Sequence, residues 1–215
     1  MALDVSKGPK GDSAPKGGSK INLSKTSSTV NLAKGAATIV VNLNWDQDAG
    51  KIVKRGLFGN KVSGGIDLDL GCLYELKDGS KGAVQALGNS FGSYNQPPYV
   101  NLDKDDRTGS STDGENLFIN GTQIDKIERI LVYTFIYSGI PSWDKANGVI
   151  TIKHTGPDIV INMDEHDPNK TMCALAMITN DNGTFRIDRL VKYYDRHQSM
   201  DKAYNWGLRW VAGRK

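Results

Sequence analysis

The chain has 215 residues, of which 24 are glycine, 38% are hydrophobic and 24% are charged, with a formal net charge of +3. This composition is ordinary for one globular domain, and the many glycines favour turns and therefore β structure. Six lysines and two aspartates in residues 1–36 account for the positive charge, which argues against a basic nucleic-acid groove in the rest of the chain.

Neither a membrane span nor a secretory leader is visible in the sequence, because no apolar run has the required length. The two cysteines, Cys72 and Cys173, lie in separate apolar runs and are predicted to be buried free thiols. Both observations favour a cytoplasmic protein.

Residues 1–18 are rich in lysine, glycine, proline and serine and carry almost nothing to bury, which predicts a flexible basic tail. Residues 19–215 are predicted to form one domain. Short runs of alternating or β-branched residues predict strands at residues 21–24, 29–33, 38–45, 65–74, 83–87, 130–137, 148–153, 158–162, 172–179 and 185–191.

Helix is scarce, with one turn expected at residues 123–128 and a short helix at residues 196–204. Glycine, asparagine and proline punctuate nearly every gap between the predicted strands and permit tight turns. We therefore predict an all-β fold, a β-sandwich of two mainly antiparallel sheets with a short helix near the C-terminus.

Two aspartates stand two residues apart on a predicted strand, at Asp67 and Asp69. Both point to one face, while the leucines and isoleucine between and beside them point to the core. Like charges this close repel unless a positive partner lies beside them. Lys61 or Arg55 could be that partner, and a bound cation is the alternative.

A second acidic cluster runs from Asp103 to Glu115, with five carboxylates against Lys104 and Arg107. Glycines at positions 109 and 114 allow sharp bends that aim backbone and side-chain oxygens at one point, as hard divalent cations require. The spacing is not that of an EF-hand. Composition leaves both calcium and magnesium open, as well as a solvated acidic turn.

Several segments, in order, resemble the tellurium-resistance TerD domain family. They are residues 21–25 (Ile-Asn-Leu-Ser-Lys), 30–34 (Val-Asn-Leu-Ala-Lys), 44–46 (Asn-Trp-Asp), 65–69 (Gly-Ile-Asp-Leu-Asp), 94–96 (Tyr-Asn-Gln), 108–109 (Thr-Gly), 124–127 (Ile-Asp-Lys-Ile) and 185–186 (Phe-Arg). No single segment is decisive, but their order and spacing over roughly residues 20 to 190 are fairly specific.

The resemblance implies a calcium-binding β-sandwich. Carried over position by position, it indicates these metal ligands: Asp67, Asp69, Asn95, Asp106, Asp113 and Glu115, with Asp46 as a further member. The chain departs from the family pattern where the first aspartate of the Asp-x-Asp-Leu-Asp strand is missing, and where residues 110–112 are Ser-Ser-Thr in place of glycine and aspartate. The second of these departures removes oxygen ligands that a second calcium site would use.

The C-terminal residues extend past the usual end of the domain and resemble the TerA-like branch of the group. Trp206 and Trp210 in this extension either pack as one helical face or form a contact for a partner, and packing is the favoured alternative.

Enzyme motifs are weak in this sequence. Residues 88–92 match Gly-x-Ser-x-Gly, but Pro97 and Pro98 prevent the helix that a hydrolase elbow requires. Residues 164–167 (Asp-Glu-His-Asp) fit a polar turn, no histidine or cysteine spacing suggests zinc, and no phosphate-binding glycine loop is present. We expect a protein without catalytic activity.

Three functions follow as hypotheses. The first is a calcium-binding protein of a bacterial stress or tellurite-resistance system that also contacts other proteins of that system. The second is a calcium-independent scaffold that docks proteins through its tail and the segment from Trp206 to Trp210. The third, suggested only by distant kinship of the family, is a binder of a small molecule or nucleotide.

Overall fold

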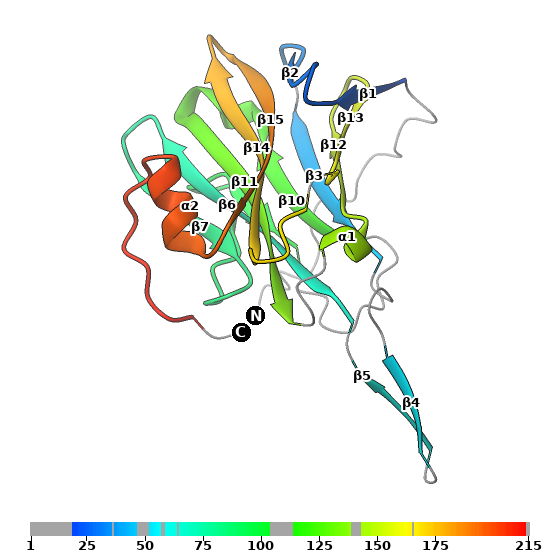
Figure 1. Cartoon of the computed structure of the whole chain (residues 1–215). Coiled ribbons are helices and arrows are strands. Elements are labelled where there is room, and N and C mark those ends of the chain that lie inside the picture. The colour runs from blue at the N-terminus through cyan, green and yellow to red at the C-terminus, as the bar shows by residue number, and fades with distance from the viewer. Residues whose placement is uncertain are drawn as a thin grey trace, which may run out of the picture.

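The computed structural model describes residues 19–35, 37–46, 52–56, 59–63, 65–103, 114–138, 143–164 and 166–213, with backbone only for residues 52–56 and 59–63. Two β-sheets stacked face to face form the body of the protein (Figure 1). The predicted all-β sandwich of mainly antiparallel sheets is therefore confirmed. The predicted tail at residues 1–18 lies outside the described residues.

In spatial order, the first sheet consists of β1 (Lys20–Leu23), β13 (Asp158–Asn162), β12 (Val149–Lys153), β3 (Thr38–Asn44), β10 (Glu115–Asn120), β9 (Val100–Leu102) and β8 (Gly92–Ser93). The second consists of β2 (Thr29–Asn31), β15 (Thr184–Tyr194), β14 (Met172–Asp181), β11 (Ile127–Ser138), β6 (Asp67–Leu76) and β7 (Lys81–Gln85). All pairings are antiparallel except β1 with β13.

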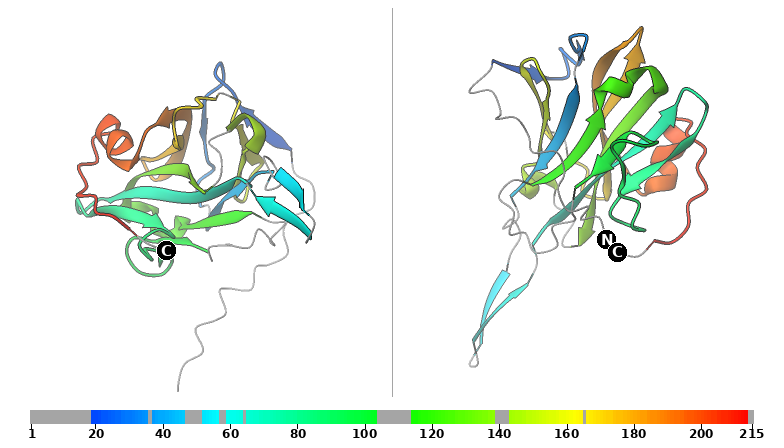
Figure 2. Two further views of the ribbon diagram at one scale, coloured as in Figure 1. Left: turned by 60° about the horizontal axis from the view of Figure 1, so that its bottom comes forward. Right: turned by 180° about the vertical axis from the view of Figure 1, so that it is seen from behind.

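A separate hairpin of β4 (Ile52–Gly56) and β5 (Gly59–Ser63) leads away from the sandwich, as the right-hand view of Figure 2 shows. Helical structure is limited to a 3-10 helix, η1 (Gly121–Lys126), and two short helices, α1 (Trp143–Ala146) and α2 (His197–Ala203). The turn at residues 123–128 and the C-terminal helix agree with the predictions. Within the described ranges, no helix is long and apolar enough to cross a membrane.

Alternating apolar side chains build the core between the two sheets. In β3 the buried positions are Ile39, Val41 and Leu43, and in β6 they include Leu68 and Leu70. Because side chains alternate along a strand, each sheet presents one continuous apolar face to the other. This burial is the main stabilising term of the sandwich.

No strand was predicted at residues 115–120, where the structure has β10. Glu115 is the first residue of β10 and pairs with Leu43 of β3. Polar residues stand at both ends of β10, at Glu115 and Asn120. They obscure the alternation of buried and half-buried side chains that would otherwise predict this strand from the sequence. The predictions also missed the short strands β8 and β9, which have too few residues to show a period, and the hairpin of β4 and β5.

The second sheet also has an apolar outer face, and the chain covers it with its own C-terminus. We call residues 197–213 the C-terminal segment; it is α2 and the red trace that follows it in Figure 1. A second hydrophobic cluster lies beneath the segment. Its members are Leu73, Leu131, Tyr133, Phe135, Met172, Ala174, Met200 and Trp206.

Trp206 and Trp210 both pack against this face, as favoured, but they are not on one helix, because α2 ends at Ala203. Trp206 is only 3% exposed, and its indole donates a hydrogen bond to the Tyr74 carbonyl at 3.0 Å. The guanidinium of Arg129 lies 4.0 Å from the centre of the Trp206 ring, within cation–π range.

One buried carboxylate holds the end of the C-terminal segment in place. The oxygens of Asp201 accept hydrogen bonds from the backbone amides of Gly207 (2.8 Å) and Leu208 (2.9 Å) and from the Trp210 indole (2.9 Å). Hydrogen bonds to a charged acceptor are stronger than neutral ones. The segment is therefore fixed by polar bonds as well as by its apolar contacts.

Candidate metal site

The open edge of β6 is the place where the two sheets are joined by side chains. Strand β7 pairs with β6 from Gly71 onward, and among the residues that the structure describes no other strand pairs with this edge of β6. The Trp45 indole donates to the Ile66 carbonyl at 2.9 Å. The Leu70 amide donates to Oε2 of Glu115 at 2.5 Å. Thus Trp45, directly after β3, and Glu115 of β10 bind backbone groups just before and within β6.

These contacts gather predicted ligands at one end of the sandwich. Asp46 follows Trp45, whose partner carbonyl precedes Asp67. Glu115 bonds to the amide that follows Asp69. Four of the predicted ligands, which come from the end of β3, from β6 and from the start of β10, therefore lie at the same end.

The four carboxylates differ in burial. Asp69 is 0% exposed and Glu115 is 3% exposed, whereas Asp67 is half-buried and Asp46 is exposed. Taking an ionised carboxylate out of water is costly unless hydrogen bonds, protons or cations offset the loss of hydration. Two carboxylates, Asp69 and Glu115, are therefore buried at this end of the molecule, where acidic side chains are rarely buried without compensating interactions.

Asp69 also influences the outer face of the second sheet. Alternation along β6 puts it on the same side as Gly71 and Leu73, and Leu73 belongs to the cluster beneath the C-terminal segment. Burial raises the pKa of Tyr133 well above its usual value, and the negative charge of Asp69 contributes to that rise. In the β6–β11 ladder Tyr133 is opposite Gly71, two residues from Asp69 on the same face.

The acidic segment of residues 104–113 leaves from this same end, between β9 and β10. The residues that flank this segment are bonded to each other. Asp103 accepts hydrogen bonds from the backbone amide (2.9 Å) and the side-chain amide (2.8 Å) of Asn116. The Asn116 oxygen in turn accepts from the Asn42 amide at 2.9 Å. Burial raises the pKa of Asp103, against the opposing effect of the Asn116 hydrogen bonds.

Gly114 is needed where the acidic segment meets β10. Its φ is +68°, and a Cβ there would lie 2.0 Å from the Leu43 carbonyl oxygen. The backbone therefore passes so close to β3 that a side chain does not fit. This close approach directs Glu115 toward β6.

Of the remaining predicted ligands, only Asn95 lies within the described residues. Asn95 is exposed and follows Tyr94, whose carbonyl accepts from the Asn120 side chain at 3.0 Å, so it lies near the end of β10 opposite Glu115. Asp106 and Asp113 lie outside the described residues. The side chains of Lys61 and Arg55, the proposed counter-charges, are likewise outside the description.

The comparison with known proteins identifies the group to which this sandwich belongs. The chain is 45% identical over 201 residues, or 92% of its length, to a protein named tellurium resistance protein TerA from Alcaligenes sp.. This chain belongs to the tellurium-resistance TerD family. It spans 59% of the length of that TerA relative. No family model matched the chain.

Two solved structures share the fold of this TerD-family chain. One is a Streptomyces coelicolor A3(2) homologue of the telluride resistance protein TerD, with a TM-score of 0.51 and 17% identity over 78% of this chain and 95% of that one. The other is a protein of unknown function, SAV2460, with a TM-score of 0.55 and 14% identity over the same shares. At these identities the likeness shows the fold alone.

The donor atoms gathered in this TerD-family chain suit a hard cation. They are carboxylate oxygens, whereas Cys72 and Cys173 are buried in the core between the sheets. Among the residues that the structure describes, no three histidine, cysteine, aspartate or glutamate side chains are grouped closely enough to hold a metal ion.

The other sequence candidates have structural partners. The Ser90 hydroxyl donates to the Ala83 carbonyl at 2.6 Å, and no helix follows it within residues 91–103. Asp164 forms an ion pair with the buried Arg189. Neither arrangement presents a nucleophile beside a base, which is what nucleophilic catalysis requires.

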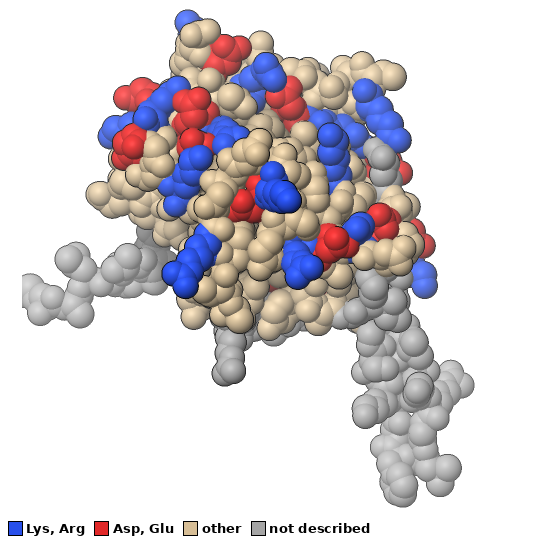
Figure 3. Space-filling view, turned by 60° about the vertical axis from the view of Figure 1, so that its left-hand side comes forward, with Lys and Arg blue, Asp and Glu red and all other residues tan. Residues whose placement is uncertain are grey.

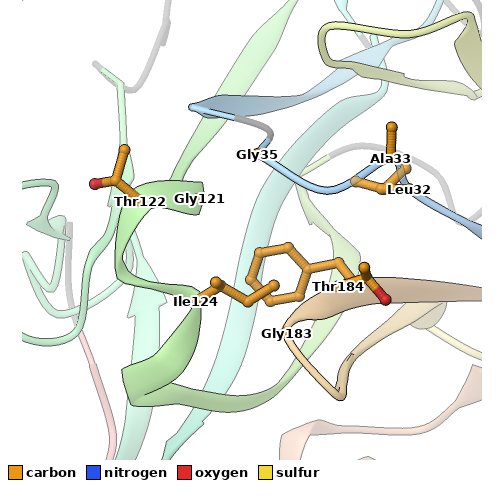
Figure 4. Close-up of a pocket in the computed structure, with 9 residues that line it drawn as sticks. Leu32, Ala33, Gly35, Gly121, Thr122, Ile124, Gly183 and Thr184 are labelled. Carbon is orange, nitrogen blue, oxygen red and sulfur yellow. The ribbon is translucent and has the colours of Figure 1, made fainter.

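A small cavity lies at the end of the sandwich away from Glu115. Its volume is about 230 Å³, and its walls come from the turn after β2, from η1 and from the start of β15 (Figure 4). The residues lining it are Leu32, Ala33, Gly35, Gly121, Thr122, Ile124, Gly183, Thr184 and Phe185. None of these residues has an ionisable side chain.

The face shown in Figure 3 carries lysines and arginines interleaved with aspartates and glutamates. Nucleic-acid binding requires a clustered positive surface, because it depends on neutralising several phosphates. This face lacks such a cluster among its described residues.

Proposed function

We propose that this chain is a calcium-binding, non-catalytic protein of a cytoplasmic stress system that confers tellurite resistance. The observation that carries the calcium proposal is the gathering of carboxylates from three segments at one end of the sandwich, where the acidic residues 104–113 are also rooted. The similarity to the TerA protein of Alcaligenes supports the link to tellurite resistance.

Each side chain has a distinct part in this proposal. Asp69 and Glu115 would be the buried ligands, held in place by β6 and β10. Asp67 and Asp46 are more exposed and would complete the site from the solvent side. Asp106 and Asp113 would be ligands supplied by the acidic segment, and the residues that flank this segment are held together by the hydrogen bonds between Asp103 and Asn116.

Calcium suits this arrangement because it accepts six to eight oxygen ligands in irregular geometry. When bound, the ion would supply the positive charge that makes close carboxylates tolerable. Ligands drawn from separate strands and a long connection fit calcium better than magnesium, which needs near-ideal octahedral geometry.

Calorimetric titration with calcium tests the proposal directly. Wild-type protein is expected to show saturable binding, and the double variant Asp67→Asn, Asp69→Asn is expected to lose at least about tenfold in affinity, since each ligand charge contributes to the site. Asp125→Asn is the matched control, because Asp125 is exposed in η1 at the other end of β10. Wild-type protein that gives no saturable heat with calcium would refute the proposal.

Two further titrations locate the site. Asp106→Asn and Asp113→Asn are expected to weaken calcium binding if residues 104–113 supply ligands. Asn95→Ala is expected to leave the affinity unchanged, because the structure places Asn95 near Asn120 rather than near Glu115. A large loss of affinity in the Asn95 variant would show that the ligand set is different.

The calcium-independent scaffold loses part of its support from the structure. Trp206, one of the two aromatic residues suggested as a docking contact, is 3% exposed and packs against the chain's own second sheet. A partner could reach it only by displacing the C-terminal segment.

A further inference from the structure

The cavity between the turn after β2, η1 and the start of β15 has an apolar floor. Leu32 is 4% exposed, Phe185 is 2% exposed, and Ile124 of η1 is half-buried and packs against the same core. Figure 4 shows Ile124 on one side of the cavity and Leu32 on the other. At the exposed Gly35 and Gly183, a Cβ would meet none of the described atoms within 4 Å, so these two residues leave the rim open.

Hydrogen bonds between the walls hold the cavity in shape. The Leu32 amide donates to the Phe185 carbonyl at 2.8 Å, which joins the turn after β2 to β15. Asn180 of β14 joins the other two walls, because its side-chain amide donates to the Ile124 carbonyl at 2.6 Å and its side-chain oxygen accepts from the Gly183 amide at 3.0 Å. Protein interiors are close-packed, so a hollow persists where the walls are prevented from closing.

The polar groups around the cavity are bonded within the chain. The amide and the hydroxyl of Thr122 both donate to the side-chain oxygen of Asn120, at 3.2 Å and 2.6 Å. The Thr184 hydroxyl donates to the Asp181 carbonyl at 2.9 Å. Since the nine lining residues also lack ionisable side chains, a charged ligand would lose its hydration here without an opposite charge to compensate.

We propose that this cavity is a binding site for a small uncharged molecule, mainly apolar and about the size of one substituted aromatic ring. An apolar cavity of about 150 Å³ is large enough to bind benzene. The volume of about 230 Å³ found here leaves room for a ring with a substituent. The driving force is removal of the ligand and of the floor formed by Leu32, Ile124 and Phe185 from water.

The site is independent of the proposed calcium site. Thr122 and Ile124 belong to η1, which follows the end of β10 opposite Glu115. None of the carboxylates proposed as calcium ligands lines the cavity. Failure of the calcium proposal would therefore leave this inference standing, and the reverse also holds.

Titration of the isotope-labelled full chain with toluene, followed by the NMR shifts of its backbone amides, tests the site. Saturable shift changes are expected at Leu32, Gly121, Ile124 and Phe185. Benzoate is the matched probe, because it has the same ring with an ionised carboxylate. It is expected to bind at least about tenfold more weakly than toluene, since its charge must leave water.

Ile124→Phe provides a second test, because the larger side chain takes up space within the cavity. This variant is expected to weaken toluene binding by at least about tenfold. Ile21→Phe is the matched control, because Ile21 is also half-buried and packs against the same core but does not line the cavity. It is expected to keep the wild-type affinity for toluene. Wild-type shifts for the β11 and β14 amides verify that each variant is folded.

Three results would overturn the proposal. The first is wild-type protein that gives no saturable shifts with toluene, or gives them away from the lining residues. The second is benzoate binding as tightly as toluene, which would show that the site does not select uncharged molecules. The third is folded Ile124→Phe with the wild-type affinity. If that variant does not fold, the wild-type titrations with the two probes still decide the outcome.

Discussion

Protonation of His197 should weaken the folded state in mildly acidic solution. The ring is enclosed by Trp210, Phe135 and Tyr133, and burial lowers its pKa from 6.5 to about 4. Below pH 6.5 His197 is protonated in the unfolded chain, whereas in the folded chain it becomes protonated only at about pH 4. The contribution of neutral His197 to the free energy of unfolding is therefore fully present above pH 6.5 and is lost as the pH falls to about 4.

The size of this effect follows from the interval between the two pKa values. At about 1.4 kcal/mol for each pH unit, it amounts to about 3 kcal/mol in the free energy of unfolding. This is a large share of the stability of a typical domain.

Urea unfolding at a series of pH values measures this effect. In His197→Phe the aromatic packing is kept and the titrating group is removed, so the difference in unfolding free energy between wild type and variant should change by about 3 kcal/mol between pH 7 and pH 4. The raised pKa of Asp103 acts in the opposite direction, but it is common to both proteins and cancels. His166→Phe, at an exposed position, is the control. Parallel pH profiles for wild type and His197→Phe would refute the reasoning.

Three further predictions concern stability, each measured by urea unfolding. Asp201→Ala removes the acceptor of three hydrogen bonds and should cost about 3 to 5 kcal/mol, whereas Asp201→Asn should cost less because it keeps one acceptor oxygen; equal costs would contradict this account. Gly71→Ala should destabilise by about 1 to 3 kcal/mol, because its methyl group meets the fully buried Tyr133 ring, and a neutral effect would show that the ring can move. Gly114→Ala should cost at least as much, since it combines a positive φ with a clash on the Leu43 carbonyl; a stable variant would contradict the close approach.

The sequence was most informative where one face of a strand is apolar and the other polar. The alternation in β3, β12 and β13 predicted both the strands and the face that enters the core. The same argument placed Leu68 and Leu70 in the core and the two aspartates of β6 on the opposite face. Local periodicity carries this information, so no knowledge of the partners was needed.

What the sequence could not show depends on partners that are distant along the chain. Nothing near Asp69 indicates that its face is covered, because the covering residues come from the C-terminus. Nothing near Glu115 indicates that it bonds to the Leu70 amide on the other sheet. The resemblance to the TerD family grouped Asn95 with these carboxylates, whereas the register of β9 and β10 places it toward the other end.

The pairing of the two N-terminal strands has a consequence for the order of folding. Strand β1 pairs with β13, and β2 pairs with β15, so each of these strands has a partner that is synthesised much later along the chain. Contacts between residues so distant in sequence form slowly, because a long loop must close first. During translation, β1 and β2 must therefore remain unpaired until β13 and β15 have been synthesised, and until then their edges are available to chaperones or to other nascent chains.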